Sequence, residues 1–267
     1  MNIIKSTGTF SFYTLISRIL GYLRDILIAI FLGSGPIADA FFVAFRIPNT
    51  FRRLFGEGSF NAAFVPSYSK ELIKGKKQSE NFANNIFNLL TIFLLGLVLL
   101  IELFMPFFVS LIAPGFKSNP EKFALATQLT KITFPFILFV SLASFFSAIL
   151  NSHNRFAAAS AAPIILNIVM IGILIFGKIL GEKLVIFLSY GVSIAGFIQA
   201  IFLILFVKKF FKPSFKIKFK ISNEIKLFFK KLLPSIFSLW CYSNKYFSWN
   251  NNCFFSGKRS FYFILRR

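Results

Sequence analysis

Acidic residues, histidine and cysteine are scarce in this chain of 267 residues, which has 9 Asp and Glu, 1 His and 2 Cys. The two cysteines, Cys241 and Cys253, fall near the end and form neither a metal-binding spacing nor a disulfide framework. The sequence also lacks nucleotide-binding loops, clusters of metal ligands and nucleophile–base pairs. We therefore expect neither an enzyme nor a cofactor, and no direct use of ATP by this chain.

Charged residues are absent from four long apolar runs, 81–101, 132–154, 156–177 and 184–207. Each run is long enough to cross a bilayer as a helix, which needs about 20 residues. The 56% of hydrophobic residues exceeds the share in an ordinary soluble domain. Alternating segments of about ten residues, which build membrane barrels, do not occur, so the sequence predicts an all-α membrane protein.

Apolar runs and turn residues together predict six membrane-spanning segments. The expected segments are 9–32, 37–70 with a break near 56–58, 82–111, 123–151, 159–176 and 184–207. Glycine and proline mark several of their ends, as in the sequence Gly33-Ser34-Gly35-Pro36. We expect residues 1–207 to form one six-helix lobe, kinked at Pro48 and Pro135.

Lysine and arginine dominate the charge, with 30 of them and a net charge of +21. They gather in the gaps between apolar runs, which indicates membrane topology and disfavours nucleic acid as a partner. The gap at 70–77 and the stretch at 208–220 are the most basic. With six crossings, both lie on the side of the N-terminus, which we expect to be cytoplasmic.

The character of the chain changes after the sixth segment. Residues 208–237 are basic and amphipathic, and we expect them to lie along the cytoplasmic surface and to start a seventh helix. Residues 238–267 lack apolar periodicity, and we interpret them as a tail translated out of frame. The nucleotide sequence tests this, because a shifted frame without further apolar helices would refute it.

Charged residues concentrate in the first two predicted segments. The arginines there are Arg18, Arg24, Arg46, Arg52 and Arg53, and the acids are Asp25, Asp39 and Glu57. A charge at mid-bilayer costs roughly 2.5–3.5 kcal/mol, so such side chains usually face a partner or a water-filled cavity. Residues seven apart share a helix face, which places Asp39, Arg46 and Arg53 in one stripe and Arg18 with Asp25 in another.

Two interpretations of these charges are open. In the first, they form internal ion pairs, such as Arg18 or Arg24 with Asp39 and Arg53 with Glu57. In the second, the arginines line a cavity for an anion, because guanidinium groups suit bidentate contact with phosphate and outnumber the acids. The second interpretation predicts a pyrophosphate head group as the ligand.

Several motifs resemble the MviN/MurJ family of lipid II flippases. They are Ser17-Arg18-Ile19-Leu20-Gly21 with Arg24-Asp25, the runs 39–49 and 52–60, and the shorter motifs at 63–66, 113–116, 133–135 and 148–151. The resemblance covers about residues 1–238. It implies the N-terminal lobe of a MATE-like (multidrug/oligosaccharidyl-lipid/polysaccharide) exporter, in which two six-helix lobes surround a cationic cavity.

The resemblance also implies a function. That family moves lipid II, the lipid-linked peptidoglycan precursor, from the inner to the outer leaflet of the bacterial cytoplasmic membrane by alternating access. By the same resemblance, Arg18, Arg24 and Arg52 match arginines implicated in binding the diphosphate, and Asp39 matches a functional acid. The remaining candidate substrate-binding residues are Asp25, Glu57, Arg53 and Ser17.

The expected partners are lipid II, membrane lipids and the missing C-terminal lobe. Because alternating access needs two lobes, we expect that this chain alone does not transport. The alternatives are a flippase for another undecaprenyl-linked sugar and a non-transporting membrane fragment.

Overall fold

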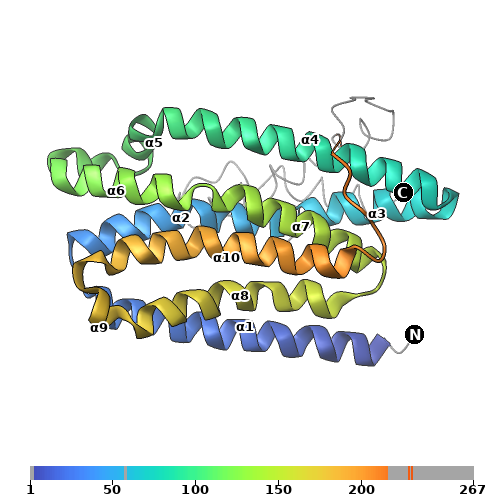
Figure 1. Ribbon diagram of the computed structural model, residues 1–267, viewed down its shortest axis with the longest axis horizontal. Coiled ribbons are helices and arrows are strands. Elements are labelled where there is room, and N and C mark those ends of the chain that lie inside the picture. The colour runs from blue at the N-terminus through green and yellow to red at the C-terminus, as the bar shows by residue number, and fades with distance from the viewer. Residues whose placement is uncertain (1–2, 57–58, 216–227, 229, 231–267) are drawn as a thin grey trace, which may run out of the picture.

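The computed structural model describes the backbone of residues 3–56, 59–215, 228 and 230. Within these ranges the side chains of residues 3–7, 47, 51–56, 59, 178, 180 and 182 are not described. The described part is built from helices that run side by side along the long axis of the molecule, and it contains no strand (Figure 1).

The α-helices are α1 (Ile3–Leu32), α2 (Pro36–Gly56), α3 (Ser59–Lys74), α4 (Lys76–Leu103), α5 (Met105–Ile112), α6 (Pro120–Thr133), α7 (Phe136–Ser152), α8 (Phe156–Ile175), α9 (Gly177–Leu180) and α10 (Leu184–Val207). Two 3₁₀ turns, η1 (Pro114–Ser118) and η2 (Gly181–Lys183), complete the connections. The six predicted segments are α1, α2 with α3, α4 with α5, α6 with α7, α8, and α10, which confirms the all-α prediction.

The third and fourth segments differ in detail from the prediction. The third begins at Lys76 rather than near residue 82, because the chain needs just Gly75 to turn between α3 and α4. Gly75 has φ +134°, a conformation that side chains rarely allow. The third segment then breaks at Phe104, and the fourth breaks at Phe134 and Pro135, where proline removes a helical donor.

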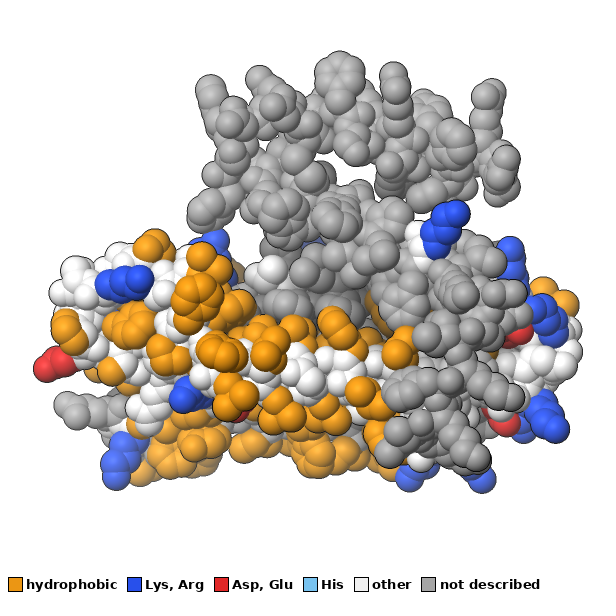
Figure 2. Space-filling model, turned by 90° about the horizontal axis from the view of Figure 1, so that it is seen from above, with side chains coloured by type: hydrophobic (Ala, Val, Ile, Leu, Met, Phe, Trp, Pro, Cys, Tyr) orange, Lys and Arg blue, Asp and Glu red, His pale blue; other side chains and the backbone are white. Residues whose placement is uncertain are grey.

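The surface matches a lipid environment. Four helical stretches, Lys76–Leu103, Pro120–Ser152, Phe156–Ile175 and Leu184–Val207, are long and apolar enough to cross a membrane. Figure 2 shows hydrophobic side chains over the middle of one face and lysine and arginine side chains mainly toward its two ends. This distribution is the one expected when the helices stand across a bilayer.

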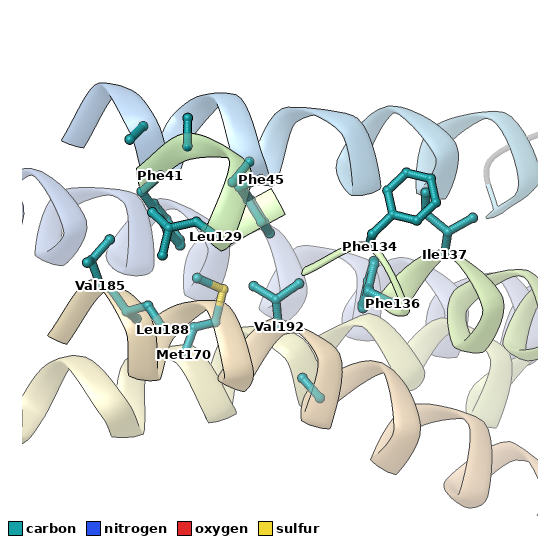
Figure 3. Packing of buried hydrophobic residues seen from close by; sticks show 14 of the residues in the cluster. Phe41, Phe45, Leu129, Phe134, Phe136, Ile137, Met170, Val185, Leu188 and Val192 are labelled. Carbon is teal, nitrogen blue, oxygen red and sulfur yellow. The ribbon is translucent and has the colours of Figure 1, made fainter. Parts of the chain in front are cut away.

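Two buried clusters hold the bundle together. The first contains Phe41 and Phe45 of α2, Leu129 of α6, Met170 of α8 and Leu188 of α10 (Figure 3). The second is aromatic and includes Phe60, Phe64 and Tyr68 of α3 with Phe145 of α7; the ring of Phe228 also packs there. At the edge of the bundle, α1 packs chiefly on α8.

The ends of the bundle agree with the predicted topology. The N-terminus, the turn between α3 and α4, and the end of α10 lie at one end of the long axis, on the right of Figure 1. The described parts of the two most basic stretches, 70–77 and 208–215, therefore lie at the same end as the start of α1. The predicted connector to residue 237 and the out-of-frame tail lie, apart from residues 208–215, Phe228 and Lys230, outside the described residues, so both stay predictions.

Candidate anion-binding site

Arg24 lies on the side of α1 that packs against α8. Its Nη1 donates to Oδ1 of Asn167 at 3.0 Å, and its Nε and Nη2 donate to Oδ1 of Asp25 at 3.0 and 2.7 Å. The ring of Phe45 on α2 has its centroid 5.4 Å from the guanidinium carbon. Because 13% of its side chain is exposed, Arg24 is a largely enclosed cation at the meeting point of α1, α2 and α8.

Asp25 and Arg18 lie on the neighbouring face of α1, where both side chains are exposed. The side chain of Asp25 is 63% exposed although it pairs with Arg24. Arg18 is exposed and forms no hydrogen bond or ion pair with any residue that the structure describes. At 1.5 Å per residue, Arg24 and Arg18 are about 12 Å and 21 Å from the end of α1 at Leu32. Both distances are shorter than the thickness of a hydrocarbon layer, which is about 30 Å.

The charged stripe of α2 is exposed along its described part. Phe41 and Phe45, on the opposite side of α2, are buried, whereas Asp39 and Arg46 are exposed. The heptad spacing thus predicts the exposed face of this helix correctly, since residues seven apart stay on one side. Arg46 lies about 15 Å along the helix from the start of α2.

The ion pairs are not those predicted from the sequence. Asp39 pairs with Lys122 of α6, whose Nζ lies 2.5 Å from Oδ2 and 4.3 Å from the ring centroid of Phe116. Neither Arg18 nor Arg24 pairs with Asp39, so that part of the ion-pair interpretation is wrong. The physical reason is packing, because α2 lies against α6 and α7 while α1 lies against α8.

The other predicted site residues are placed less fully. Ser17 contributes its backbone carbonyl, which accepts a hydrogen bond of 2.9 Å from Nδ2 of Asn167. Arg52 and Arg53 lie in the last turns of α2, but their side chains are outside the description, and Glu57 lies between the described ranges. The predicted pair of Arg53 with Glu57 therefore stays a prediction.

Two residues of this region were not found from the sequence. Asn167 is a polar residue in the charge-free run 156–177, and its amide in such a run was the available signal. Lys122 falls just before the predicted segment 123–151, whereas it lies in the first turn of α6 and reaches α2. Pairing across elements is decided by packing and leaves little trace in local sequence.

The described side chains leave positive charge in excess. Arg18, Arg24, Arg46 and Lys122 are cations, against the two carboxylates Asp25 and Asp39. Opposite charges attract more strongly in a medium of low dielectric constant than in water. The exposed guanidinium of Arg18 on α1 is therefore suited to hold an anionic group.

The helical arrangement of this chain resembles about half the length of solved membrane transporters. The structure described as "Lipid II flippase MurJ, inward closed conformation" is 31% identical with a TM-score of 0.68, covering 86% of this chain and 48% of that one. A MATE transporter in complex with MaD3S has a TM-score of 0.67 over 91% of this chain and 55% of its own. At 18% identity, the second likeness shows the fold alone.

Sequence comparison identifies the family. The family described as Lipid II flippase MurJ matches residues 28–243. The "Probable lipid II flippase MurJ" of Rhizobium meliloti (strain 1021) is 43% identical over 204 residues, which are 74% of this chain and 38% of the relative. The chain belongs to the lipid II flippase MurJ family, as the motifs predict. It spans less than half the length of the curated relatives it matches.

Proposed function

We propose that this chain supplies the N-terminal lobe of a flippase that moves lipid II from the inner to the outer leaflet of the bacterial cytoplasmic membrane. The lipid is carried without chemical change, so the lobe binds and releases its ligand and does not react with it. Membership of the MurJ family and the names of its relatives support this substrate.

The observation that carries the proposal is the exposed face of α1 that bears the guanidinium of Arg18. Arg18 is at membrane depth and has no partner in the described part of the chain, although a charge there is costly. A lipid-linked diphosphate provides the missing counter-charge at that depth. Arginine also suits this ligand, because its planar group can form two parallel hydrogen bonds to phosphate oxygens.

Alternating access requires a second lobe against this face. The relatives are more than twice as long as the matched part of this chain, which supports a complete transporter with two lobes. In our proposal the diphosphate sits between the lobes, and rocking of one lobe against the other exposes it to each side of the membrane. A single lobe binds the head group but does not move it.

The orientation in the membrane follows from the basic end of the bundle. Lys74, Lys76 and Lys77 at the turn between α3 and α4 lie at the same end as Lys208 and Lys209 after α10. Short basic loops stay in the cytoplasm. We therefore place this end, with the N-terminus, on the cytoplasmic side of the inner membrane.

Complementation of a flippase-depleted bacterium tests the proposal. One strain expresses residues 1–267, and a second expresses a chimaera in which residues 1–207 replace the matching helices of the Rhizobium meliloti relative. We expect growth with the chimaera, no growth with the chain alone, and no growth when the chimaera carries Arg18→Ala. A chimaera that inserts normally but fails to support growth contradicts the flippase function. Growth with the chain alone contradicts the need for a second lobe.

A further inference from the structure

Asn167 uses both ends of its side-chain amide to hold α1. Its Oδ1 accepts from Nη1 of Arg24 at 3.0 Å, and its Nδ2 donates to the carbonyl oxygen of Ser17 at 2.9 Å. The direction of both bonds follows from chemistry, because a guanidinium can only donate and a carbonyl can only accept. The amide can therefore sit in this site in a single orientation.

The surroundings of Asn167 make these bonds important. The residue is 5% exposed in α8, a helix without charged side chains. A buried amide that lost its partners would be strongly disfavoured. The backbone of α1 lies directly against it, since a Cβ on Gly21 would be 3.7 Å from Nδ2. Asn167 therefore fixes the distance and register of α1 on α8.

The same bonds restrict the guanidinium of Arg24. Of its five N–H groups, three form the bonds to Asp25 and Asn167 given above, and two have no partner among the described residues. The ring of Phe45 lies near the same group, from the side of α2. A guanidinium held from three sides loses little rotational freedom when it binds a ligand.

We infer that Asn167 is a positioning residue for the anion-binding site. It holds the guanidinium of Arg24 so that the two remaining N–H groups are presented to the diphosphate. This inference depends on the proposed function, because it assigns Arg24 to that ligand. It differs from a purely structural tether, which would join α1 to α8 without affecting how Arg24 binds.

A double-mutant cycle on diphosphate binding separates these roles. The full chain is reconstituted in lipid nanodiscs and titrated calorimetrically with farnesyl diphosphate, and farnesol measures adsorption of the apolar tail. The variants are Asn167→Leu, which keeps the volume and removes both bonds, Asn167→Ala as a second test, Arg24→Ala, and the double variants. Asn88→Leu is the matched control, because Asn88 is equally buried at 5% exposed but lies in α4.

We expect Asn167→Leu and Asn167→Ala to weaken farnesyl diphosphate binding by roughly tenfold, the lower end of the range for loss of a hydrogen bond to a charged group. In the Arg24→Ala background neither should weaken it further, because the group they position is gone. Asn88→Leu should bind as the unmodified chain does.

The outcomes separate this inference from the proposed function. If Arg24→Ala weakens binding of farnesyl diphosphate while the Asn167 variants do not, Asn167 is not a positioning residue. The same conclusion follows if the Asn167 substitutions weaken binding equally in the unmodified chain and in the Arg24→Ala background. If the unmodified chain does not bind, or if Arg24→Ala binds as tightly, the proposed diphosphate site is wrong and the inference fails with it.

Discussion

Lys122 and Asp39 form an ion pair between the first turn of α6 and the first turn of α2, with Nζ and Oδ2 2.5 Å apart. The ammonium is largely enclosed, at 18% exposed, while the carboxylate is 57% exposed. The first turns of α2 and α6 lie at the end of the bundle opposite the N-terminus, so the pair joins the two helices there. The carboxylate of Asp39 stays accessible to a ligand.

The exposure of Asp39 limits what this pair contributes to stability. A double-mutant cycle with Asp39→Asn and Lys122→Met should give a coupling free energy below about 1 kcal/mol, because water screens a half-exposed pair. The coupling should fall further in about 1 M salt. Thermal unfolding in detergent, followed by circular dichroism, measures both values. A coupling that is large and insensitive to salt would show that the carboxylate is enclosed.

Arg18 and Arg24 should respond differently to replacement by alanine. Arg24→Ala leaves Asn167 and Asp25 without their partner and should lower the free energy of unfolding by about 1–3 kcal/mol. Arg18→Ala removes an exposed side chain without a partner in the described part, and should leave the unfolding midpoint unchanged. Both should weaken binding of farnesyl diphosphate. Equal loss of stability in the two variants would contradict the contacts described for Arg24.

Gly196 allows α10 to pack closely against α7. A Cβ at this position would lie 2.5 Å from Cδ2 of Phe136 and 3.3 Å from Cβ of Phe139. Gly196→Ala should therefore destabilise the bundle by about 1–3 kcal/mol through overpacking. Gly172→Ala in α8 is the control, because a Cβ there has no neighbour within 4 Å in the described residues. The two unfolding midpoints, compared in one detergent, check this prediction; similar midpoints would argue against the close packing.

His153 should make the basic end of the bundle sensitive to acid. Its ring stacks on Phe210 with centroids 4.4 Å apart, and its Nε2 lies 3.3 Å from the hydroxyl of Tyr68. Burial lowers the pKa of His153 below its ordinary value of 6.5. The unfolded chain therefore binds the proton more readily, so stability is complete above pH 6.5 and declines as the pH falls below it.

Replacement of the histidine tests this directly. In His153→Phe the side chain at this position no longer titrates, so from about pH 8 to pH 5 the unfolding midpoint of the unmodified chain should fall relative to that of the variant. A constant difference over that range would mean that protonation of His153 is not coupled to folding.

Four of the six predicted spans, those of α4, of α6 with α7, of α8 and of α10, are long and apolar enough to cross a membrane, and they could be predicted because each depends on local composition. The run 184–207 became α10 with the same ends, whereas the predicted break near 56–58 falls partly outside the described residues and stays a prediction. The third segment was less accurate, because the turn at Gly75 depends on one backbone angle that composition does not reveal. A membrane-spanning segment is indicated by the composition of many consecutive residues, whereas a tight turn depends on the conformation of a single residue.

The charged face of α2 could be predicted, because it depends on the spacing of residues within one helix, but the partners of its charges could not. The heptad spacing of Asp39 and Arg46 specifies one helix face, and both are exposed. Their partners come from other helices, so Lys122 and Asn167 were missed. Which acid meets which base is decided by the helices that pack together, and distant parts of the chain determine that.

The amino-acid sequence alone determined that this protein crosses a membrane as helices and carries arginines where lipid should be, because apolar length and charge are properties of each segment. Only the tertiary structure decided that Arg24 is held by Asn167 and Asp25 while Arg18 stays open. These differences depend on contacts between α1 and α8, which are separated by more than a hundred residues in the chain.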